Sequence, residues 1–220
     1  MCIRDRCNIC VFAGTTEGRE LVEFLAGQPV QATVCVATEY GETLLPEAEN
    51  ITVLAGRIPV EDIIRMLQET RFDLVIDATD NFAAKFLIND ACVLAGKPYI
   101  HAGVVGFAGQ VMTVIPGEGP CYRCIFRYLP AAGEIPTCKE AGVLGAVVGV
   151  IGSLEATEAV KLIAGVGEPL VARMLTVDAL TMNIRRVPLP KHVPDCPVCG
   201  EQPTITAIDP ANYIQPACAI

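Results

Sequence analysis

The chain has 220 residues, of which 52% are hydrophobic and 19% charged, so it can bury a core without help from disulfides. This composition excludes an intrinsically disordered chain, a coiled coil and a collagen-like repeat. The formal net charge of −9 argues against a nucleic-acid partner, because phosphate binding needs clustered Lys and Arg.

The first third of the chain alternates apolar runs with helical patterns. An apolar run at 8–13 leads through a glycine-punctuated turn into a helical pattern over 19–26. Further strand-like runs cover 32–37, 50–55 and 73–77, and a second helical pattern covers 60–69. Near-continuous Val and Ile runs between helices are typical of parallel strands covered on both faces. The sequence therefore predicts an α/β fold with a Rossmann-like, mostly parallel sheet and helices on both faces.

Beyond residue 80 the pattern continues with fewer helices. Helices are expected from 81 to about 95 and over 142–164, and strands at 99–102, 109–115 and within 173–187, followed by a Pro-punctuated arm from Pro188. The most apolar stretch, 143–154, is too short for a bilayer span of about 20 residues, so we expect a buried core helix and no membrane partner. The start, with Arg4, Asp5 and Arg6, does not resemble a secretory leader, and a cytoplasmic protein is expected.

Two C-x-x-C pairs stand out among the eleven cysteines. Such a pair lets two sulfurs reach one tetrahedral ion, and a second pair completes a four-thiolate shell that leaves no open position for catalysis. We therefore predict a structural zinc site that tethers the C-terminal arm to the body, with the ligands Cys121, Cys124, Cys196 and Cys199. The alternatives are four unrelated buried thiols or metal-free redox pairs. No role is predicted for Cys2, Cys7, Cys10, Cys35, Cys92 and Cys218, for which a small buried hydrophobe is the default.

Polar residues follow the strand predicted at 73–77. Asp80 and Asn81 stand at its carboxyl end, where open α/β sheets bind their ligands. A carboxylate there can hold Mg²⁺ on the phosphates of a nucleotide. The alternative is that one of these residues caps the following helix. These residues alone leave both interpretations open.

Three further features are weaker. Cys138 lies alone in a loop beside Lys139 and ahead of a helix, which favours a thiolate nucleophile, although a lone loop cysteine is more often incidental. His101 is expected to be a satisfied core or strand-end histidine. A candidate phosphate cradle at a helix start lacks the Lys or third Gly of the established motifs; its residues are Gly14, Thr15, Thr16, Gly18 and Arg19.

Several longer segments carry a family resemblance. They are DLVIDATDN at 73–81, LINDAC at 87–92, VVGFAGQ at 104–110, CYRC at 121–124, EAGVLG at 140–145, VIGSLEATEAVK at 150–161, CPVCG at 196–200 and PTIT at 203–206. Residues 73–208 thereby resemble the ThiF/MoeB/HesA family of E1-like adenylyltransferases. The resemblance implies a homodimer that uses Mg·ATP to adenylate the C-terminal glycine of a ubiquitin-like sulfur carrier protein, for thiamin or molybdopterin biosynthesis. It also implies that Asp80 binds magnesium beside Asn81, that Cys138 takes part in sulfur transfer, and that the four paired cysteines bind zinc.

The beginning of the chain resembles a different family. The segments VFAGTTEGREL at 11–21 and VATEYG at 36–41 are similar to the start of the precorrin-6A reductases, which bind NADPH. This second resemblance would place Gly14 to Arg19 near dinucleotide phosphates. We therefore expect two segments, 1–72 and 73–220, in a chimeric chain, and the initial MCIRDR is similar to a translated sequencing adapter.

The replaced first segment bears on the expected activity. No lysine precedes Lys85, and the usual Gly-rich, Arg and Lys elements of the E1-like enzymes are absent. Adenylyl transfer depends on cations that neutralise developing charge, so we expect an impaired adenylyltransferase. The alternatives are an NADPH-dependent, precorrin-6A reductase-like oxidoreductase of cobalamin biosynthesis and a non-catalytic, zinc-stabilised scaffold that binds a carrier.

Overall fold

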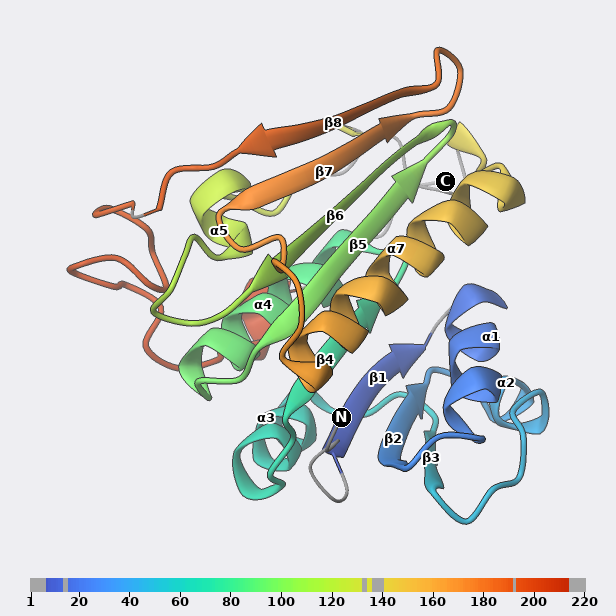
Figure 1. The fold of residues 1–220 in the computed structure, drawn as a ribbon. Helices are drawn as coiled ribbons and strands as arrows, with labels where there is room; N and C mark the ends of the chain where they lie inside the picture. The colour runs from blue at the N-terminus through green and yellow to red at the C-terminus, as the bar shows by residue number, and fades with distance from the viewer. Residues whose placement is uncertain (1–6, 14–15, 132–133, 136–140, 192, 214–220) are drawn as a thin grey trace.

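Eight strands form one sheet in the computed structural model, which describes residues 7–13, 16–131, 134–135, 141–191 and 193–213 (Figure 1). The order across the sheet is β3-β2-β1-β4-β5-β6-β7-β8. The strands are β1 (Cys7–Ala13), β2 (Val30–Val36), β3 (Ile51–Ala55), β4 (Leu74–Ala78), β5 (Tyr99–Val105), β6 (Ala108–Val114), β7 (Arg173–Asp178) and β8 (Asn183–Pro188). The helices are α1 (Thr16–Leu25), α2 (Glu39–Thr43), α3 (Val60–Glu69), α4 (Phe82–Leu94), α5 (Tyr122–Ile125), α7 (Gly145–Ala164) and the 3₁₀ turn η1 (Pro210–Tyr213).

The strands from β3 to β5 are parallel. Val11 of β1 lies opposite Val34 of β2 on one side and Ile76 of β4 on the other, and all three side chains are buried. A central parallel strand is covered on both faces, which explains why these runs are apolar rather than alternating. Chain order runs outward in opposite directions from β1 and β4, so the topological switch point lies between them. The predicted α/β, Rossmann-like sheet is confirmed.

The other side of the sheet is antiparallel, through the pairs β5–β6, β6–β7 and β7–β8. The run predicted within 173–187 is a hairpin that turns between Asp178 and Asn183. Asp178 accepts hydrogen bonds from the amide of Leu180 at 3.0 Å and from the hydroxyl of Thr181 at 2.7 Å. Met182 has a positive φ of 53°. Because neither Gly nor Pro marks this turn, the sequence pattern did not reveal it.

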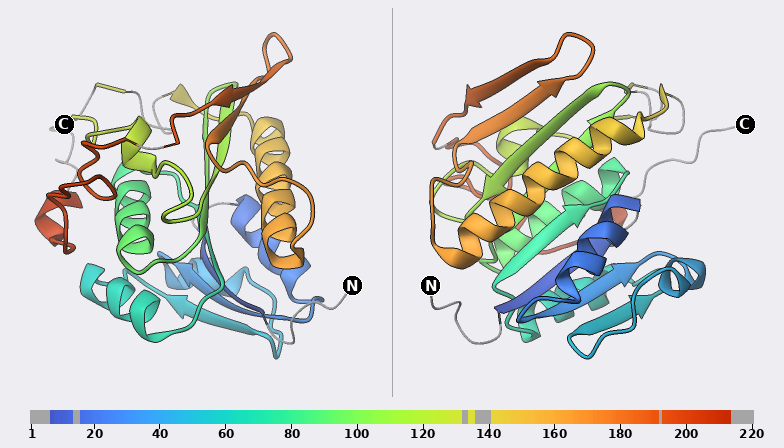
Figure 2. Two further views of the ribbon diagram at one scale, coloured as in Figure 1. Left: turned by 60° about the vertical axis from the view of Figure 1, so that its left-hand side comes forward. Right: turned by 45° about the vertical axis from the view of Figure 1, so that its right-hand side comes forward.

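Helices cover both faces of the sheet, as predicted (Figure 2). On one face α1 and α7 pack over a core that includes Val11, Val34 and Ile100. On the other face α3 and α4 pack over a second core around Phe86 and Tyr99. The sheet therefore separates two hydrophobic cores, and side chains on alternate positions of each strand belong to opposite ones.

Helix α7 is buried along one face only. Val147 and Ile151 are buried, whereas Val150 and Val160 are 48% and 49% exposed; just before the helix, Val143 and Leu144 are 39% and 45% exposed. Residues 143–154 were expected to form a buried core helix. They are instead buried on one side and exposed on the other, although nearly all of them are apolar. Among the described helices, none is long and apolar enough to cross a membrane.

The segment after β8 folds back over α4 and α5 (Figure 2). At its end the Tyr213 hydroxyl donates a hydrogen bond of 2.7 Å to the Asp90 carboxylate on α4. Midway, Arg127 Nη2 donates to the main-chain oxygen of Asp195 at 2.6 Å. Besides the cysteines, these polar contacts and apolar side chains such as Val198, which is buried in the core of the α4 face, attach the arm to the helical face.

Candidate functional site

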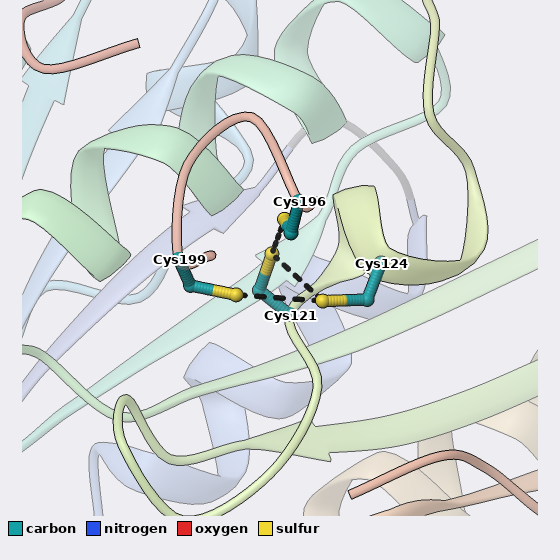
Figure 3. A group of neighbouring side chains, drawn as sticks. All are labelled: Cys121, Cys124, Cys196 and Cys199. Carbon is teal, nitrogen blue, oxygen red and sulfur yellow. Dashed lines mark hydrogen bonds between the residues drawn. The ribbon is translucent and has the colours of Figure 1, made fainter. Parts of the chain in front are cut away.

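Four cysteines meet where the C-terminal arm reaches α5 (Figure 3). Their sulfur atoms all lie within 4.8 Å of one another. The separations are 3.6 Å for Cys121–Cys196, 3.8 Å for Cys121–Cys124 and 3.4 Å for Cys124–Cys199. Four sulfurs at about 2.3 Å from a tetrahedral ion would stand about 3.8 Å apart, so the cluster has the dimensions of a metal centre. The predicted juxtaposition of the two pairs is confirmed.

Each cysteine pair is held in a tight turn. The amide of Cys124 donates to the oxygen of Cys121 at 3.0 Å, and the amide of Gly200 donates to the oxygen of Cys196 at 3.1 Å. A Cβ at Gly200 would lie 2.5 Å from the oxygens of Pro194 and Cys196, so only glycine fits. Hydrogen bonds from Cys121 are the largest cause of lowered pKa values at Cys196 and Cys199, and the latter falls to about 7. The hydrogen bond to Cys124 is the largest cause of the raised pKa at Cys121.

Two buried polar residues of α4 support the first pair. Asn89 accepts hydrogen bonds of 2.8 Å from the Tyr122 amide and the Tyr99 hydroxyl, and its amide lies 3.9 Å from Cys121 Sγ. The neighbouring Asp90 accepts from Arg123 Nε at 2.8 Å to each carboxylate oxygen. Helix α4 thus fixes the turn that carries Cys121 and, through Tyr213, the end of the arm.

The segment after β4 contains both residues for which the sequence left two roles open, helix capping and ligand binding. Asn81 is the N-cap of α4, and its side-chain oxygen accepts a hydrogen bond from the Ala84 amide at 2.8 Å. Asp80 is exposed, and within the described part of the chain no hydrogen bond or ion pair involves it; its carboxylate therefore stays available to a ligand. The capping interpretation holds for Asn81, and the ligand interpretation remains for Asp80.

A buried ion pair lies directly beneath this segment. Lys85 Nζ donates to Asp77 Oδ2 at 3.2 Å and to the oxygen of Ala102 at 2.6 Å. His101 Nδ1 lies 3.0 Å from Asp77 Oδ2, and its Nε2 lies 3.3 Å from Gln110 Nε2. The predicted core histidine is confirmed. Because Asp77 is an acceptor and the Gln110 amide a donor, Nδ1 carries the proton and Nε2 accepts.

Charges in this network shift two pKa values. Burial alone would raise the pKa of Asp77, but Lys85 and His101 hold it well below its usual range. Burial, followed by the charge of Lys85, lowers the pKa of His101. Asp77 is therefore ionised and His101 neutral near pH 7.

Two cavities open on opposite faces of the sheet around the carboxyl end of β4. Cavity 1, of about 830 Å³, lies on the α4 face and is lined by polar groups of α4 and the antiparallel strands, including Lys85, His101, Gln110 and Arg185. Cavity 2, of about 600 Å³, lies on the α7 face beside the switch point and is lined by groups that include Ala13, Arg19, Thr38 and Glu155. Both are lined by Thr79, Asp80, Gly103 and Val104. One exposed carboxylate, that of Asp80, thus borders both chambers.

The predicted glycine-rich turn is described only in part. Gly18 lies in α1, where a Cβ would stand 2.9 Å from the Cβ of Ala13; glycine there lets α1 pack closely on β1. Arg19 lines cavity 2 and lies 3.9 Å from Glu23. Thr16 is the first residue of α1. Gly14, Thr15 and Cys138 lie outside the described residues.

The remaining cysteines follow the default expectation where they are described. Cys7, Cys10, Cys35 and Cys92 are all buried. Burial is the largest cause that raises the pKa of Cys7 to about 11, as is typical of unreactive thiols. Cys2 and Cys218 lie outside the described residues.

Sequence reasoning missed several buried polar groups. Lys85 and Asn89 interrupt an otherwise apolar helix at a spacing of four, which puts them on the same side of the helix. That spacing was a usable signal for a buried polar stripe. Gln110 and Glu155 carried no such signal, because their surroundings come from residues far away in the sequence.

Comparisons with known proteins agree with this architecture. The sequence model of the ThiF family matches residues 29–198. The chain is 44% identical over 153 residues to the sulfur carrier protein adenylyltransferase of Thermus thermophilus and 44% identical over 148 residues to the SAMP-activating enzyme E1 of Haloferax volcanii. Each match covers 67% of this chain, and 55% and 53% of those proteins. The adenylyltransferase and sulfurtransferase MOCS3 of Sus scrofa is 45% identical over 63% of this chain and 30% of its own length.

Solved structures show the same fold. The structure of Escherichia coli MccB with ATP has a TM-score of 0.68 at 18% identity, over 90% of this chain and 68% of that one. The complex of E. coli MccB with MccA-N7isoASN has a TM-score of 0.70 at 17% identity, with the same coverage. This chain spans about half the length, or less, of the curated relatives described above. The family match extends over most of the sheet and over three of the four paired cysteines, ending at Val198, and on that basis the chain belongs to the ThiF family.

Proposed function

We propose that this chain is an adenylyltransferase that activates the C-terminal glycine of a ubiquitin-like sulfur carrier protein with Mg·ATP. One observation carries the proposal: the exposed Asp80 carboxylate borders two chambers on opposite faces of the sheet, which gives a nucleotide and a carrier tail separate access to one point. The names of the relatives described above support the same chemistry for proteins of this family. Biosynthesis of thiamin or of the molybdenum cofactor is the expected pathway.

Cavity 2 suits the nucleotide. It lies at the carboxyl ends of β1 and β4, the switch point at which doubly wound sheets bind dinucleotides and nucleotides. Asp80, with Asn81 beside it, would hold Mg²⁺ on the phosphates. The glycine-rich turn of Gly14, Thr15, Thr16, Gly18 and Arg19 would lie against those phosphates. Among the described residues that line cavity 2, Arg19 alone is cationic, which supports an activity below that usual for the family.

Cavity 1 suits the carrier tail. Gly103 and Gly109 line it without side chains, and Gln110 and Arg185 offer hydrogen-bond donors to an extended main chain and its terminal carboxylate. In the proposed reaction that carboxylate attacks the α-phosphorus of ATP, the bond to the β-phosphate oxygen breaks, and the products are an acyl-adenylate and pyrophosphate. We propose that the Cys138 thiolate then attacks the acyl carbon, with AMP as the leaving group.

We propose that the cysteine cluster holds a structural zinc ion. The donor set of four thiols at tetrahedral separations fits Zn²⁺, and a closed shell supplies folding energy rather than a reactive position. A homodimer is also proposed, because apolar side chains of α7 and of the β7–β8 hairpin are exposed, among them Val150, Leu180 and Met182. Light scattering after gel filtration would measure the mass, and a monomer at micromolar concentration would contradict the dimer.

The decisive experiment is carrier-dependent ATP–pyrophosphate exchange with zinc-loaded protein. Ubiquitin-like sulfur carriers that end in glycine should support exchange, whereas the same carriers without that glycine should not. Asp80→Ala should abolish the exchange, whereas Glu61→Ala, which removes an exposed carboxylate outside both cavities, should retain it. No exchange above the Asp80→Ala background would contradict the proposal.

The same zinc-loaded protein can be used to test whether the chain binds Mg·ATP or NADPH. Titration with Mg·ATP and with NADPH separates an adenylyltransferase from the NADPH-dependent reductase that the first 72 residues resemble. We expect saturable Mg·ATP binding that Asp80→Ala weakens. NADPH binding without ATP binding would mean that the N-terminal motif determines the ligand. Carrier binding with neither nucleotide would indicate the non-catalytic scaffold.

A further inference from the structure

One buried carboxyl group in cavity 2 has an oxygen without a partner. Glu155 is 4% exposed, and its Oε1 is the one buried side-chain atom of the described residues that has no hydrogen-bond partner. Other buried polar groups of the molecule, such as Glu158 and Asp90, are satisfied by two or more partners. A buried polar atom without a protein partner calls for another partner, and a ligand in the adjoining cavity can supply it.

The surroundings of Glu155 give that ligand room. Small residues face α7 across cavity 2, from Ala13 of β1, Ala78 of β4 and Ala102 of β5. On α7 itself, Gly152 lines the same cavity three residues before Glu155. The sheet and the helix therefore leave a hollow beside the carboxyl group of Glu155, which forms part of its lining.

The position of α7 indicates which part of a nucleotide lies there. Helix α7 packs against β4, β5, β6 and α1, whereas the sugar end of a nucleotide in this kind of fold lies toward the carboxyl end of β2. The phosphates lie near the start of α1 and the end of β4. Glu155 is thus on the phosphate side of cavity 2, the side that also contains Asp80.

We propose that Glu155 binds the nucleotide phosphates in its protonated form, through a hydrogen bond that its carboxyl group donates to a phosphate oxygen. The proposal rests on the function proposed above and adds a residue to its binding site. Burial, reinforced by the nearby charge of Asp77, raises the pKa of Glu155 well above the usual range, so a neutral acid is expected at pH 7. A neutral acid donates a hydrogen bond where a carboxylate would repel the phosphate.

Substitutions of Glu155 can show whether its side chain acts as a hydrogen-bond donor or as a metal ligand. Glu155→Gln keeps a donor of the same length, and Glu155→Leu removes it while filling the space. Glu155→Met is a second apolar variant, and Val160→Ala, in the same helix but outside both cavities, removes no polar atom. Calorimetric titration of each protein with Mg·ATP, AMP and adenosine gives the affinities, and thermal unfolding without ligand reports folding.

We expect the two apolar variants to bind Mg·ATP and AMP at least about tenfold more weakly, as for loss of a hydrogen bond to a charged group. Their affinity for adenosine should equal that of the wild type, whatever its value. Glu155→Gln should change none of these affinities by more than about threefold, and the same holds for the Val160→Ala control. The unfolding temperature of the apolar variants should be unchanged or higher, because they lose an unsatisfied polar atom.

Three results would overturn the inference. Unchanged ATP affinity in the apolar variants would show that Glu155 does not contact the nucleotide. Equal losses in the glutamine and leucine variants would indicate a carboxylate that binds a metal ion. Equal losses for adenosine would move the contact to the sugar or base. If the wild type binds none of the three compounds, the proposed function fails together with the inference, whereas the other results leave it standing.

Discussion

Asp80 and Asn81 are adjacent after β4 but have different surroundings. The side chain of Asn81 accepts a hydrogen bond from the helix it begins, whereas Asp80 is exposed beside both cavities. The cap satisfies an amide that the first turn of a helix otherwise leaves unpaired. Stability and ligand binding should therefore respond to different members of this pair.

Substituting each residue in turn tests this separation. Asn81→Ala should lower the free energy of unfolding by about 1 kcal/mol, the usual effect of losing an N-cap. Asp80→Ala should leave it nearly unchanged, because the described contacts of Asp80 include no hydrogen bond or ion pair. Urea unfolding measures both. Equal destabilisation by the two substitutions would contradict the assignment of the cap to Asn81.

The buried pair of Asp77 and Lys85 should matter more for stability. Lys85→Met leaves a buried carboxylate without its ammonium partner, and such changes cost about 3–5 kcal/mol. The double variant Asp77→Asn, Lys85→Met should recover part of that loss. The pKa of Asp77 is lowered in the folded state, so its contribution is present above about pH 4 and is lost as the pH falls through the folded value. In Lys85→Met, unfolding free energy should depend less on pH in this acidic range.

The contribution of Glu155 to the free energy of unfolding should change with pH in the opposite direction to that of Asp77. The pKa of Glu155 is raised on folding, chiefly by burial, so its contribution is greatest below the unfolded value of about 4.3 and is lost as pH rises toward the folded value. Glu155→Gln removes this titration. The unfolding free energy of the variant, relative to the wild type, should therefore be higher at pH 7 than at pH 4. Urea unfolding at both pH values measures it, and a difference that is the same at both would contradict a raised pKa.

At the scale of single residues, the sequence predicted what adjacent residues determine. The C-x-x-C spacing identified four cysteines whose sulfur atoms meet in the structure, although 71 residues separate Cys124 from Cys196. The prediction that His101 is a core histidine with its hydrogen bonds satisfied was also correct. The partners of Asp77 and Glu155 were not predictable, because α4, α7 and β5 bring them together only in the folded chain.

Helices and strands were likewise predicted where neighbouring residues determine them and missed where distant contacts do. The bounds predicted for α3 match the structure, because its apolar spacing and the preceding Pro59 are local signals. The β7–β8 hairpin was missed, since its turn depends on the Asp178 side chain rather than on Gly or Pro. The exposed face of α7 was also missed, because an apolar sequence does not show which side chains a neighbouring element covers.

The turn around Cys196 and Cys199 is the element most sensitive to a single atom. Gly200→Ala would place a Cβ at 2.5 Å from two main-chain oxygens, so the turn cannot close with its present geometry. We expect zinc affinity to fall by about 10–100-fold, the usual effect of disturbing the support of a metal site. Elemental analysis after dialysis against a weak chelator measures it. Gly149→Ala, in α7 with no atom within 4 Å of the added Cβ, should keep its zinc.

Over the whole molecule, the proposed join between 1–72 and 73–220 lies inside a continuous structure. Strand β1 pairs with β4 from Ile9–Leu74 to Ala13–Ala78, and the side chains of Val11 and Ile76 are completely buried at this contact. The ThiF match also begins at residue 29, ahead of the join. Both segments supply parallel, apolar strands, so they satisfy the same packing rule whatever their origin. The division itself stays a prediction.

The C-terminal arm is the part of the molecule that zinc should control. It contacts the helical face through the cysteine cluster, through Asp195 and Tyr213, and through apolar side chains such as Val198, which is buried in the core on that face. Removing zinc should loosen the arm without unfolding β1 to β5, because the core on the α7 face contains none of the described arm residues. Hydrogen exchange of zinc-loaded and chelator-treated protein would show this as lost protection in 193–213 and around Cys121, with protection in the parallel strands retained. The cysteine-independent control is Tyr213→Phe, which should loosen only the end of the arm, since it removes one hydrogen bond to Asp90. Loss of protection throughout the sheet on chelation would mean that the metal site stabilises the entire fold, and the arm would then be an integral part of the core rather than a tethered segment.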